Sequence, residues 1–291
     1  MITPTPQARL LARRKRADTI FRFVCFLAAS LGVLILVLFL YKICIDGMGR
    51  FSWKFIHASL SSRPSRTGIW PAILGSVWIM VLTGVIAVPM GVAAAIYLEE
   101  FNTRKNRLTE FIQLNIANLA GVPSIVYGML GLAVFVRWMA LKESVIAGAL
   151  TMSLLILPMV IIITQEALRA VPKGYRDGSL ALGSTYWQAI RHQVLPSALP
   201  GIFTGIILSI SRTVGETAPL IVVGAAAYVS GAPRGIGDRY TVLPIKIFDW
   251  AEESKHGFNE AAATAILVLM VALLLLNSVA IFLRARARLR R

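Results

Sequence analysis

The feature of this sequence that most constrains its fold is a series of apolar stretches, each long enough for a helix to cross a bilayer. On a window of about 20 apolar residues, six such stretches emerge, at 20–42, 70–98, 111–136, 144–165, 200–224 and 261–283. The interior of a bilayer offers no water to backbone N–H and C=O groups, so a spanning segment satisfies them within its own helix. The sequence therefore predicts an all-α integral membrane protein with six transmembrane helices.

Composition supports this class and argues against a nucleic-acid-binding protein. Of the 291 residues, 57% are hydrophobic and 15% are charged, whereas a soluble domain is about half apolar and a quarter charged. The net charge of +16 does not indicate nucleic acid, because the Lys and Arg residues cluster just outside the apolar stretches. We expect membrane lipid as a partner and no nucleic acid.

The first apolar stretch is interpreted as a retained transmembrane helix and not as a cleaved signal. Its apolar run is about as long as a full span, whereas a signal core is shorter. Cys25 and Cys44 lie near opposite ends of this helix. At about 1.5 Å of rise per residue, their separation exceeds the reach of a disulfide, and we expect both thiols to be free.

The distribution of basic residues predicts the orientation of the chain. With the N-terminus inside, cytoplasmic segments carry 17 Lys and Arg residues and external segments carry 10. The positive-inside rule therefore places both termini and residues 166–200 in the cytoplasm. The expected organisation is a basic N-terminal segment (1–19), a first transmembrane helix with an external loop (20–69), a transmembrane domain (70–283) and a basic cytoplasmic tail (284–291).

Residues 166–200 are predicted to form a helical hairpin between two spans. Pro172 suits the start of a helix, which is expected to run to Gly183. Thr185 and Gln188 have the spacing of a capping box for a second short helix, which we expect to stop before Pro196 and Pro200. The hairpin has too little apolar surface to be a domain, so we interpret it as a docking element for a partner.

Arg212 is the residue most suggestive of function. A charge within a membrane span is costly and normally faces a bundle interior or a water-filled path. Glu216 follows one helical turn later, so we expect the two side chains to share a face and partly neutralise each other. Thr213 and Thr217 flank the pair and offer hydroxyls. An Arg suits two-point recognition of an oxyanion; the alternative is a buried ion pair that only fixes helix packing.

Ser124 is a second candidate for contact with substrate. Gly121 and Pro123 precede it, so the third predicted span is expected to be locally irregular. Free N–H groups at the end of a half-helix favour anions, although a Pro kink needed only for packing is the alternative. The three histidines lack Cys or carboxylate neighbours at ligand spacing, so no metal site is predicted.

The chain is not expected to be an enzyme. A phosphate-cradling loop requires Gly-Lys followed by Ser or Thr, and no Gly-Lys dipeptide occurs in the sequence. The sequence also lacks Gly-x-Ser-x-Gly and His-Glu-x-x-His motifs.

The hairpin resembles a cytoplasmic motif of bacterial ABC-importer permeases, written Glu-Ala-Ala, three residues, Gly, nine residues, Ile-x-Leu-Pro. Here Asp177-Gly178-Ser179 occupies the first three positions, and Gly183, Leu195 and Pro196 match. The resemblance implies coupling helices that fit a groove on a separate ATPase. The residues that it assigns to coupling are Asp177, Gly178, Leu182, Gly183, Trp187, Leu195 and Pro196.

The run Ser211-Arg212-x-x-Gly215-Glu216-Thr217-Ala218-Pro219-Leu220 resembles the signature of the PstA family of phosphate-importer permeases. Three further runs agree in order: Pro123 to Gly128, Glu166 to Pro172, and Ala181 to Gly183 with Trp187. This resemblance implies the type I ABC importer permease fold, inorganic phosphate as substrate and the bacterial cytoplasmic membrane. It also implies a second permease (PstC), an ATPase dimer (PstB) and an external phosphate-binding protein (PstS).

The same resemblance implies no cofactor on this chain, with ATP and Mg used by the ATPase. One position departs from the family, because many relatives carry Arg where this chain has Ile163. Two alternatives remain open at this stage. One is a permease for another oxyanion, such as sulfate or molybdate, and the other is a non-transporting membrane scaffold or sensor.

Overall fold

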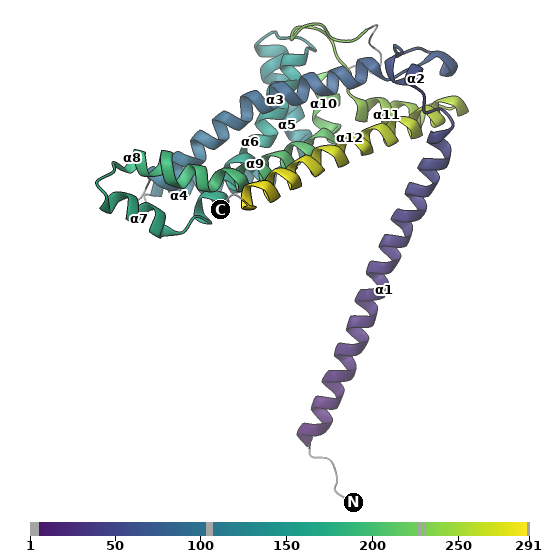
Figure 1. The fold of residues 1–291 in the computed structure, drawn as a ribbon. Coiled ribbons are helices and arrows are strands. Elements are labelled where there is room, and N and C mark those ends of the chain that lie inside the picture. Colours follow the sequence, from purple (N-terminus) through teal and green to yellow (C-terminus); the bar gives the residue numbers. More distant parts are fainter. Residues whose placement is uncertain (1–5, 103–106, 226–228, 230, 290–291) are drawn as a thin grey trace, which may run out of the picture.

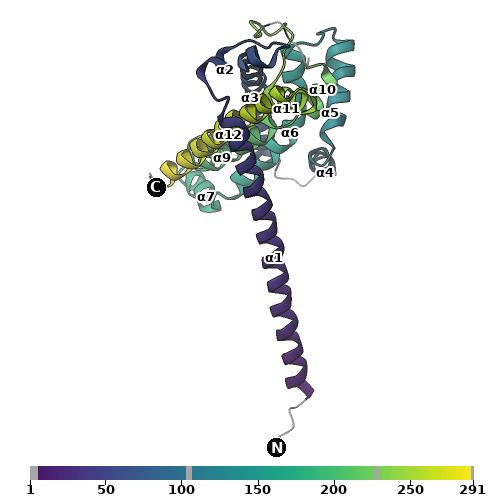
Figure 2. The same ribbon diagram turned by 90° about the vertical axis from the view of Figure 1, so that its right-hand side faces the viewer.

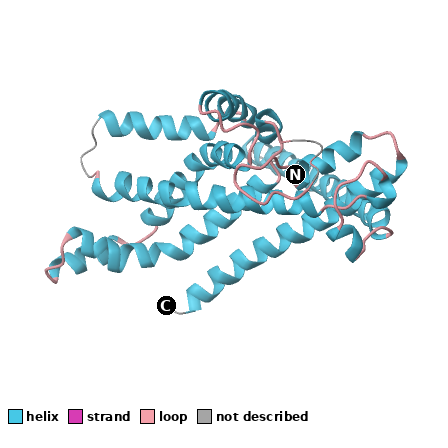
Figure 3. Cartoon of the chain, turned by 90° about the horizontal axis from the view of Figure 1, so that it is seen from above, coloured by secondary structure: helices cyan, strands magenta, loops and turns pink. Residues whose placement is uncertain are grey.

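The computed structural model describes residues 6–102, 107–225, 229 and 231–289, and these residues form helices, turns and loops without a β-strand (Figure 3). Within them, five helical segments are long and apolar enough to cross a membrane. These segments are Ala17–Met48, Trp70–Phe101, Val145–Arg169, Tyr186–Val214 and Gly257–Phe282. The all-α membrane architecture predicted from hydropathy is confirmed.

The third predicted span, 111–136, is a broken one. Helix α4 (Arg107–Ala120) and the segment Ser124–Trp138, which begins with α5 (Ser124–Gly131), meet at an angle of 101°. The break includes Gly121 and Pro123, and Pro123 lacks the N–H needed to continue a helix and disfavours helical conformation in the residue before it. Counted as one span, this pair brings the total in the described chain to six, and the irregularity expected at this position is confirmed.

The core lies around α6 (Val145–Arg169), which packs against α3 (Trp70–Ile96) and α9 (Leu195–Val214). Small residues permit the close approach of α6 and α9. A Cβ atom added at Gly205 would lie 2.1 Å from Cγ2 of Ile163. The absence of a side chain at Gly205 therefore lets the two helices pack closely. Ile163 packs against this glycine.

Helix α1 (Pro6–Met48) projects from the bundle (Figures 1 and 2). None of its most apolar window is buried against the rest of the chain. It meets α12 (His256–Leu289) close to its own C-terminal end, where the Thr264 hydroxyl donates to the backbone carbonyl of Gly47 at 2.9 Å. Cys25 and Cys44 are free thiols, as predicted.

The hairpin and the C-terminus lie at the same end of the bundle (Figure 1), which we call the hairpin end. Helix α2 (Trp53–His57) and helix α11 (Leu243–Glu252) lie at the opposite end. This arrangement agrees with the predicted topology, in which the C-terminus and residues 166–200 share one side of the membrane.

Two helix ends differ from the predictions. The second hairpin helix does not stop before Pro196, because α8 (Tyr186–Ala189) continues through a π-helical turn, Ile190–Val194, into α9. Pro196 lies in the first turn of α9 and follows that wider turn, so its missing N–H interrupts nothing. The fifth predicted span, 200–224, is interrupted: α9 ends at Val214 with Gly215 as its C-cap, and the short α10 (Ala218–Val223) follows.

Candidate substrate path and coupling hairpin

A cavity of 260 Å³ brings together most of the residues predicted to meet substrate. Its wall combines the α4–α5 break, the middle of α6 and the end of α9. The lining residues include Ser124, Arg212, Thr213 and Glu216. Thr217 is not among them; it is the half-buried N-cap of α10.

Arg212 lies in the last turn of α9 with an exposed side chain. Glu216 is beyond the end of this helix, since Gly215 terminates it. In the described residues no hydrogen bond or ion pair joins the two side chains. The two side chains therefore do not share a helical face or form an ion pair, although both line the same cavity. A cation in the last turn is favoured by the helix dipole, and the guanidinium still has its donors available to an anion.

The other polar groups of this cavity differ in the hydrogen bonds that they can still make to a ligand. The Thr213 hydroxyl already donates to the Ser209 carbonyl at 2.8 Å and is buried, so it is used within α9. Ser124 is the first residue of α5, and Pro123 caps the helix without a side-chain hydrogen bond. In this first turn the Val126 N–H donates to the Pro123 carbonyl at 3.0 Å, and the turn carries the positive end of the helix dipole.

A second cavity of 490 Å³ adjoins the first, and Met159, Ser209 and Arg212 line both. The second cavity extends along α6 and α9 to Glu166 and Gly201, residues close to the hairpin in the sequence. Arg212 therefore lies where two cavities meet. Ile163 lines the second cavity with an apolar side chain.

The hairpin has the two-helix form predicted from the sequence. Helix α7 (Lys173–Ala181) begins after Pro172, and the chain reverses at Gly183, whose φ of +85° is a left-handed conformation that favours glycine. Both hydrogen bonds of the predicted capping box at Thr185 and Gln188 are present. Both helices belong to one hairpin, although the second helix continues into a membrane-spanning segment.

The coupling residues mostly lie on the outer surface of this hairpin. Asp177, Gly178, Gly183 and Pro196 are exposed, and Leu195 is half-buried. Leu182 is 89% exposed and Trp187 is 49% exposed. Leu182 lies outside the membrane-spanning segments and Trp187 lies at the start of one. A large apolar side chain exposed outside the spans is typical of a surface that docks a partner.

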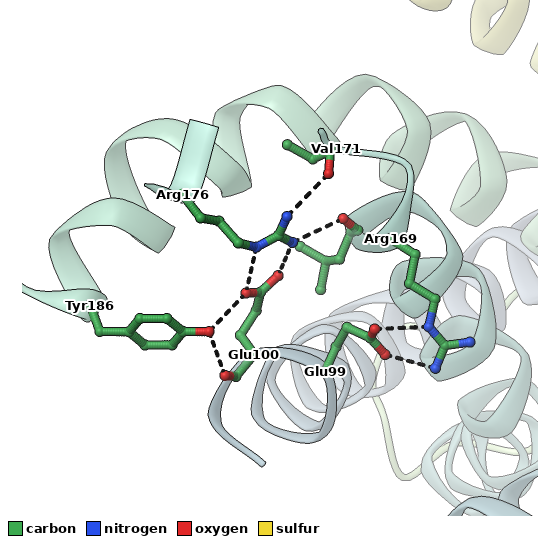
Figure 4. Close-up of polar contacts among 7 residues, drawn as sticks. Glu99, Glu100, Arg169, Val171, Arg176 and Tyr186 are labelled. Atoms are coloured by element: carbon green, nitrogen blue, oxygen red, sulfur yellow. Dashed lines mark hydrogen bonds and ion pairs between the residues drawn. The ribbon is translucent and has the colours of Figure 1, made fainter. Parts of the chain in front are cut away.

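Sequence reasoning missed the contacts that hold the hairpin to the rest of the bundle (Figure 4). Arg176 of α7 forms an ion pair with Glu100, which lies in the π-helical turn Tyr97–Phe101 at the end of α3. Tyr186 donates a hydrogen bond to the Glu100 carbonyl at 2.8 Å. The available signal was a pair of acids closing an apolar span and basic residues in the hairpin, but nothing in the sequence pairs them.

In the described residues, no group of three His, Cys, Asp or Glu side chains is arranged to hold a metal ion. The structure thus combines membrane-spanning helices, a charged cavity within them and an exposed hairpin at one end.

Solved structures of bacterial importers have this fold. A transporter for the acidic polysaccharide alginate matches 96% of this chain and 99% of its own, with a TM-score of 0.64 and 14% identity. An inward-facing MetNI methionine ABC transporter matches 78% of this chain and 99% of its own, with a TM-score of 0.57 and 19% identity. This chain therefore shares its fold with these ABC transporters.

The family model described as "binding-protein-dependent transport system inner membrane component" matches residues 87–291. Phosphate transport system permease protein PstA 1 of Mycobacterium tuberculosis H37Rv is 31% identical over 296 residues, covering 100% of this chain and 94% of the relative. PstA of Pasteurella multocida is 29% identical and covers 91% and 93% of the two chains. This chain therefore belongs to the binding-protein-dependent transport permeases of the inner membrane, and within them to the PstA family.

Two further matches concern parts of the chain. The probable ABC transporter permease protein YqgI of Bacillus subtilis is 35% identical over 208 residues, or 72% of this chain and 70% of the relative. Residues 8–68, which include most of α1 and all of α2, match a domain of unknown function. A permease of this kind works with a second permease, an ATPase and a substrate-binding protein.

Proposed function

We propose that this chain forms half of the membrane path of an ATP-driven phosphate importer and that the anion passes Arg212. The observation that carries the proposal is the unpaired guanidinium at the junction of two cavities, facing the same space as the first turn of α5. Both groups suit a tetrahedral oxyanion. The PstA relatives named above as phosphate transport permeases support the choice of substrate.

The partners would be PstC as the second permease, a PstB dimer as the ATPase and PstS as the external phosphate-binding protein. ATP and Mg would be bound and used by the ATPase, with no cofactor on this chain. ATP binding would close the ATPase pair, and the exposed surface of the hairpin around Leu182 and Trp187 would receive that movement. The two cavities meeting at Arg212 would then open alternately to the two sides of the membrane.

Glu216 favours phosphate over a fully ionised oxyanion in the same cavity. Near neutral pH phosphate still carries a proton and donates a hydrogen bond to a carboxylate, which only accepts when ionised. Sulfate and molybdate carry no such proton. They would be repelled by the Glu216 charge and would have no hydrogen bond to it that offsets the repulsion. The carboxylate also limits how tightly the anion is held, which allows release.

Reconstitution of the complete complex in proteoliposomes tests this function. With the binding protein outside and ATP inside, we expect radiolabelled phosphate to accumulate only when ATP is hydrolysed. Excess arsenate should compete, whereas excess sulfate or molybdate should not. Uptake of sulfate in preference to phosphate would assign another oxyanion. A chain that purifies without an ATPase and moves no anion would indicate a scaffold or sensor.

A further inference from the structure

Glu100 is the buried acid on which several segments of the hairpin end converge (Figure 4). It lies in the π-helical turn Tyr97–Phe101, which continues α3, and it is 2% exposed. Its carboxylate pairs with the guanidinium of Arg176 in α7, with the Arg176 Nε donating at 3.0 Å and Nη2 donating to the second oxygen. This is a two-point contact between the end of α3 and the first arm of the hairpin.

The same two side chains reach two further segments. Arg176 also donates to the backbone carbonyls of Leu168 and Val171, both at 3.1 Å. These carbonyls belong to the last turn of α6 and the link that follows it, and the Leu168 carbonyl also accepts from the Val171 N–H at 3.2 Å. From the second arm, the Tyr186 hydroxyl lies 2.8 Å from the Glu100 carbonyl and 3.3 Å from its carboxylate.

Aromatic packing reinforces this junction. Phe101 follows Glu100, and its ring meets that of Tyr186 edge-on at 5.8 Å between centroids. The Phe101 and Trp187 rings are 6.0 Å apart. The end of α3 is therefore held to both arms of the hairpin by polar and apolar contacts.

Burial of the Glu100–Arg176 pair makes the loss of either charged partner costly. The Arg176 side chain is 17% exposed, and its hydrogen bond to Glu100 raises its pKa above the ordinary value, although burial acts in the opposite direction. Charge-assisted bonds of this kind are among the strongest in proteins, and removing one partner strands the other. Arg176 and Glu100 thus hold each other in a defined position and do not form an interchangeable surface pair.

The backbone connections of the hairpin show that this junction provides its link to α3. The hairpin is joined through the backbone to α6 at one side and to α9 at the other. It has no direct backbone connection to α3. After the end of α3 the chain continues through Asn102 and not into the hairpin. We infer that Glu100 is a positioning residue that binds the end of α3 to the hairpin, so that α3 moves with the hairpin when the ATPase acts. This inference rests on the proposed transport function.

The neighbouring acid provides a matched control. Glu99 pairs with Arg169 in the last turn of α6, and the Arg169 side chain is 55% exposed. Glu99 lies in the same π-helical turn as Glu100, and its pair carries the same charges. Arg169 belongs to α6, and Glu99 makes no hydrogen bond to α7 or α8 in the described residues, so this pair is expected to contribute less to coupling than the Glu100 pair.

The test compares Glu100→Gln, Tyr186→Phe and Glu99→Gln in the complete reconstituted complex. The measured quantity is phosphate transported per ATP hydrolysed, together with the amount of ATPase that co-purifies. We expect Glu100→Gln to lower this ratio about tenfold, as befits a weakened charge-assisted bond in a buried network. Tyr186→Phe removes one hydroxyl and should lower the ratio less, and Glu99→Gln should leave it near wild type.

A role in folding alone would reduce the amount of complex while leaving the ratio of the surviving complexes unchanged, which would overturn the inference. An equal fall in Glu99→Gln would also overturn it, because the effect would then belong to any acid in this turn. If Glu100→Gln fails to assemble, an unchanged ratio in Tyr186→Phe decides against the inference. Failure of the proposed function is distinct: wild-type complex would then move no phosphate, whatever the variants do.

Discussion

Arg212, in the last turn of α9, lines the same cavity as Ser124, the first residue of α5. The two residues come from different spans, and the break before α5 is what turns a helix N-terminus towards the cavity that holds the guanidinium. A helix N-terminus and an unpaired Arg both favour an anion. The geometry therefore brings two groups that favour an anion to one cavity, which the Glu216 carboxylate also lines.

The left-handed conformation of Gly183 predicts a specific defect in coupling. Space is not limiting, because a Cβ added there meets nothing within 4 Å. The φ of +85° makes Gly183→Val unfavourable by about 1–2 kcal/mol or more. We expect less ATPase to co-purify while membrane insertion is unchanged. The control is Gly174→Ala, at a glycine in α7 with equally open surroundings; an equal loss there would show that the turn conformation is not the cause.

The contact between Gly205 and Ile163 predicts a stability defect with a matched rescue. A Cβ at position 205 would lie 2.1 Å from Ile163, so Gly205→Ala should destabilise the packing of α6 on α9 by about 1–3 kcal/mol. Thermal unfolding of the purified complex measures the effect. Shortening the partner in Gly205→Ala with Ile163→Ala should recover much of the loss, whereas simple addition of two losses would mean that the helices do not meet here.

The predicted topology is tested by labelling single cysteines in a background without Cys25 and Cys44. Ser254, in an exposed loop at the end opposite the hairpin, should react with an impermeant thiol reagent added to intact cells once changed to Cys. Arg286→Cys, on the exposed tail of α12, should react only after the membrane is opened. The reverse pattern would place the hairpin on the side without ATP.

Glu216 predicts the selectivity of the path. Under the proposed function, its carboxylate would accept a hydrogen bond from a protonated oxyanion and would repel one without a proton. Equilibrium binding to the complex without its binding protein isolates this effect from selection outside the membrane. Radiolabelled phosphate bound to the wild type should resist displacement by sulfate. In Glu216→Gln we expect sulfate to compete about tenfold better, the factor that corresponds to about 1.4 kcal/mol; unchanged competition would remove Glu216 from the site.

Local patterns in the sequence were sufficient for part of this structure. Apolar length located the spans, and the capping box at Thr185 and Gln188 marked the start of α8. The stop expected at Pro196 was wrong, since a π-helical turn before a proline absorbs its missing N–H. Gly215 likewise separates Glu216 from the helix that carries Arg212, which a spacing of four residues does not reveal.

Contacts between distant segments were beyond the reach of such patterns. The Glu100–Arg176 pair joins positions 76 residues apart, and each residue alone reads as an ordinary charge at the end of a helix. The candidate site was predictable as far as its residue types, because a charge inside a span is rare. The way in which Ser124 and Arg212 come to share a cavity depends on the bend between α4 and α5.

The most direct test of the anion path is phosphate uptake measured together with subunit abundance in variants of Arg212. Arg212→Gln should assemble with the ATPase yet lose nearly all uptake, and Arg212→Lys should retain part of it, because a point charge cannot reproduce the two-point fork. Since no ion pair with Glu216 is present in the described residues, combining Arg212→Gln with Glu216→Gln should restore nothing. A well-assembled but inactive double variant is the predicted result; a fully active one would contradict the account.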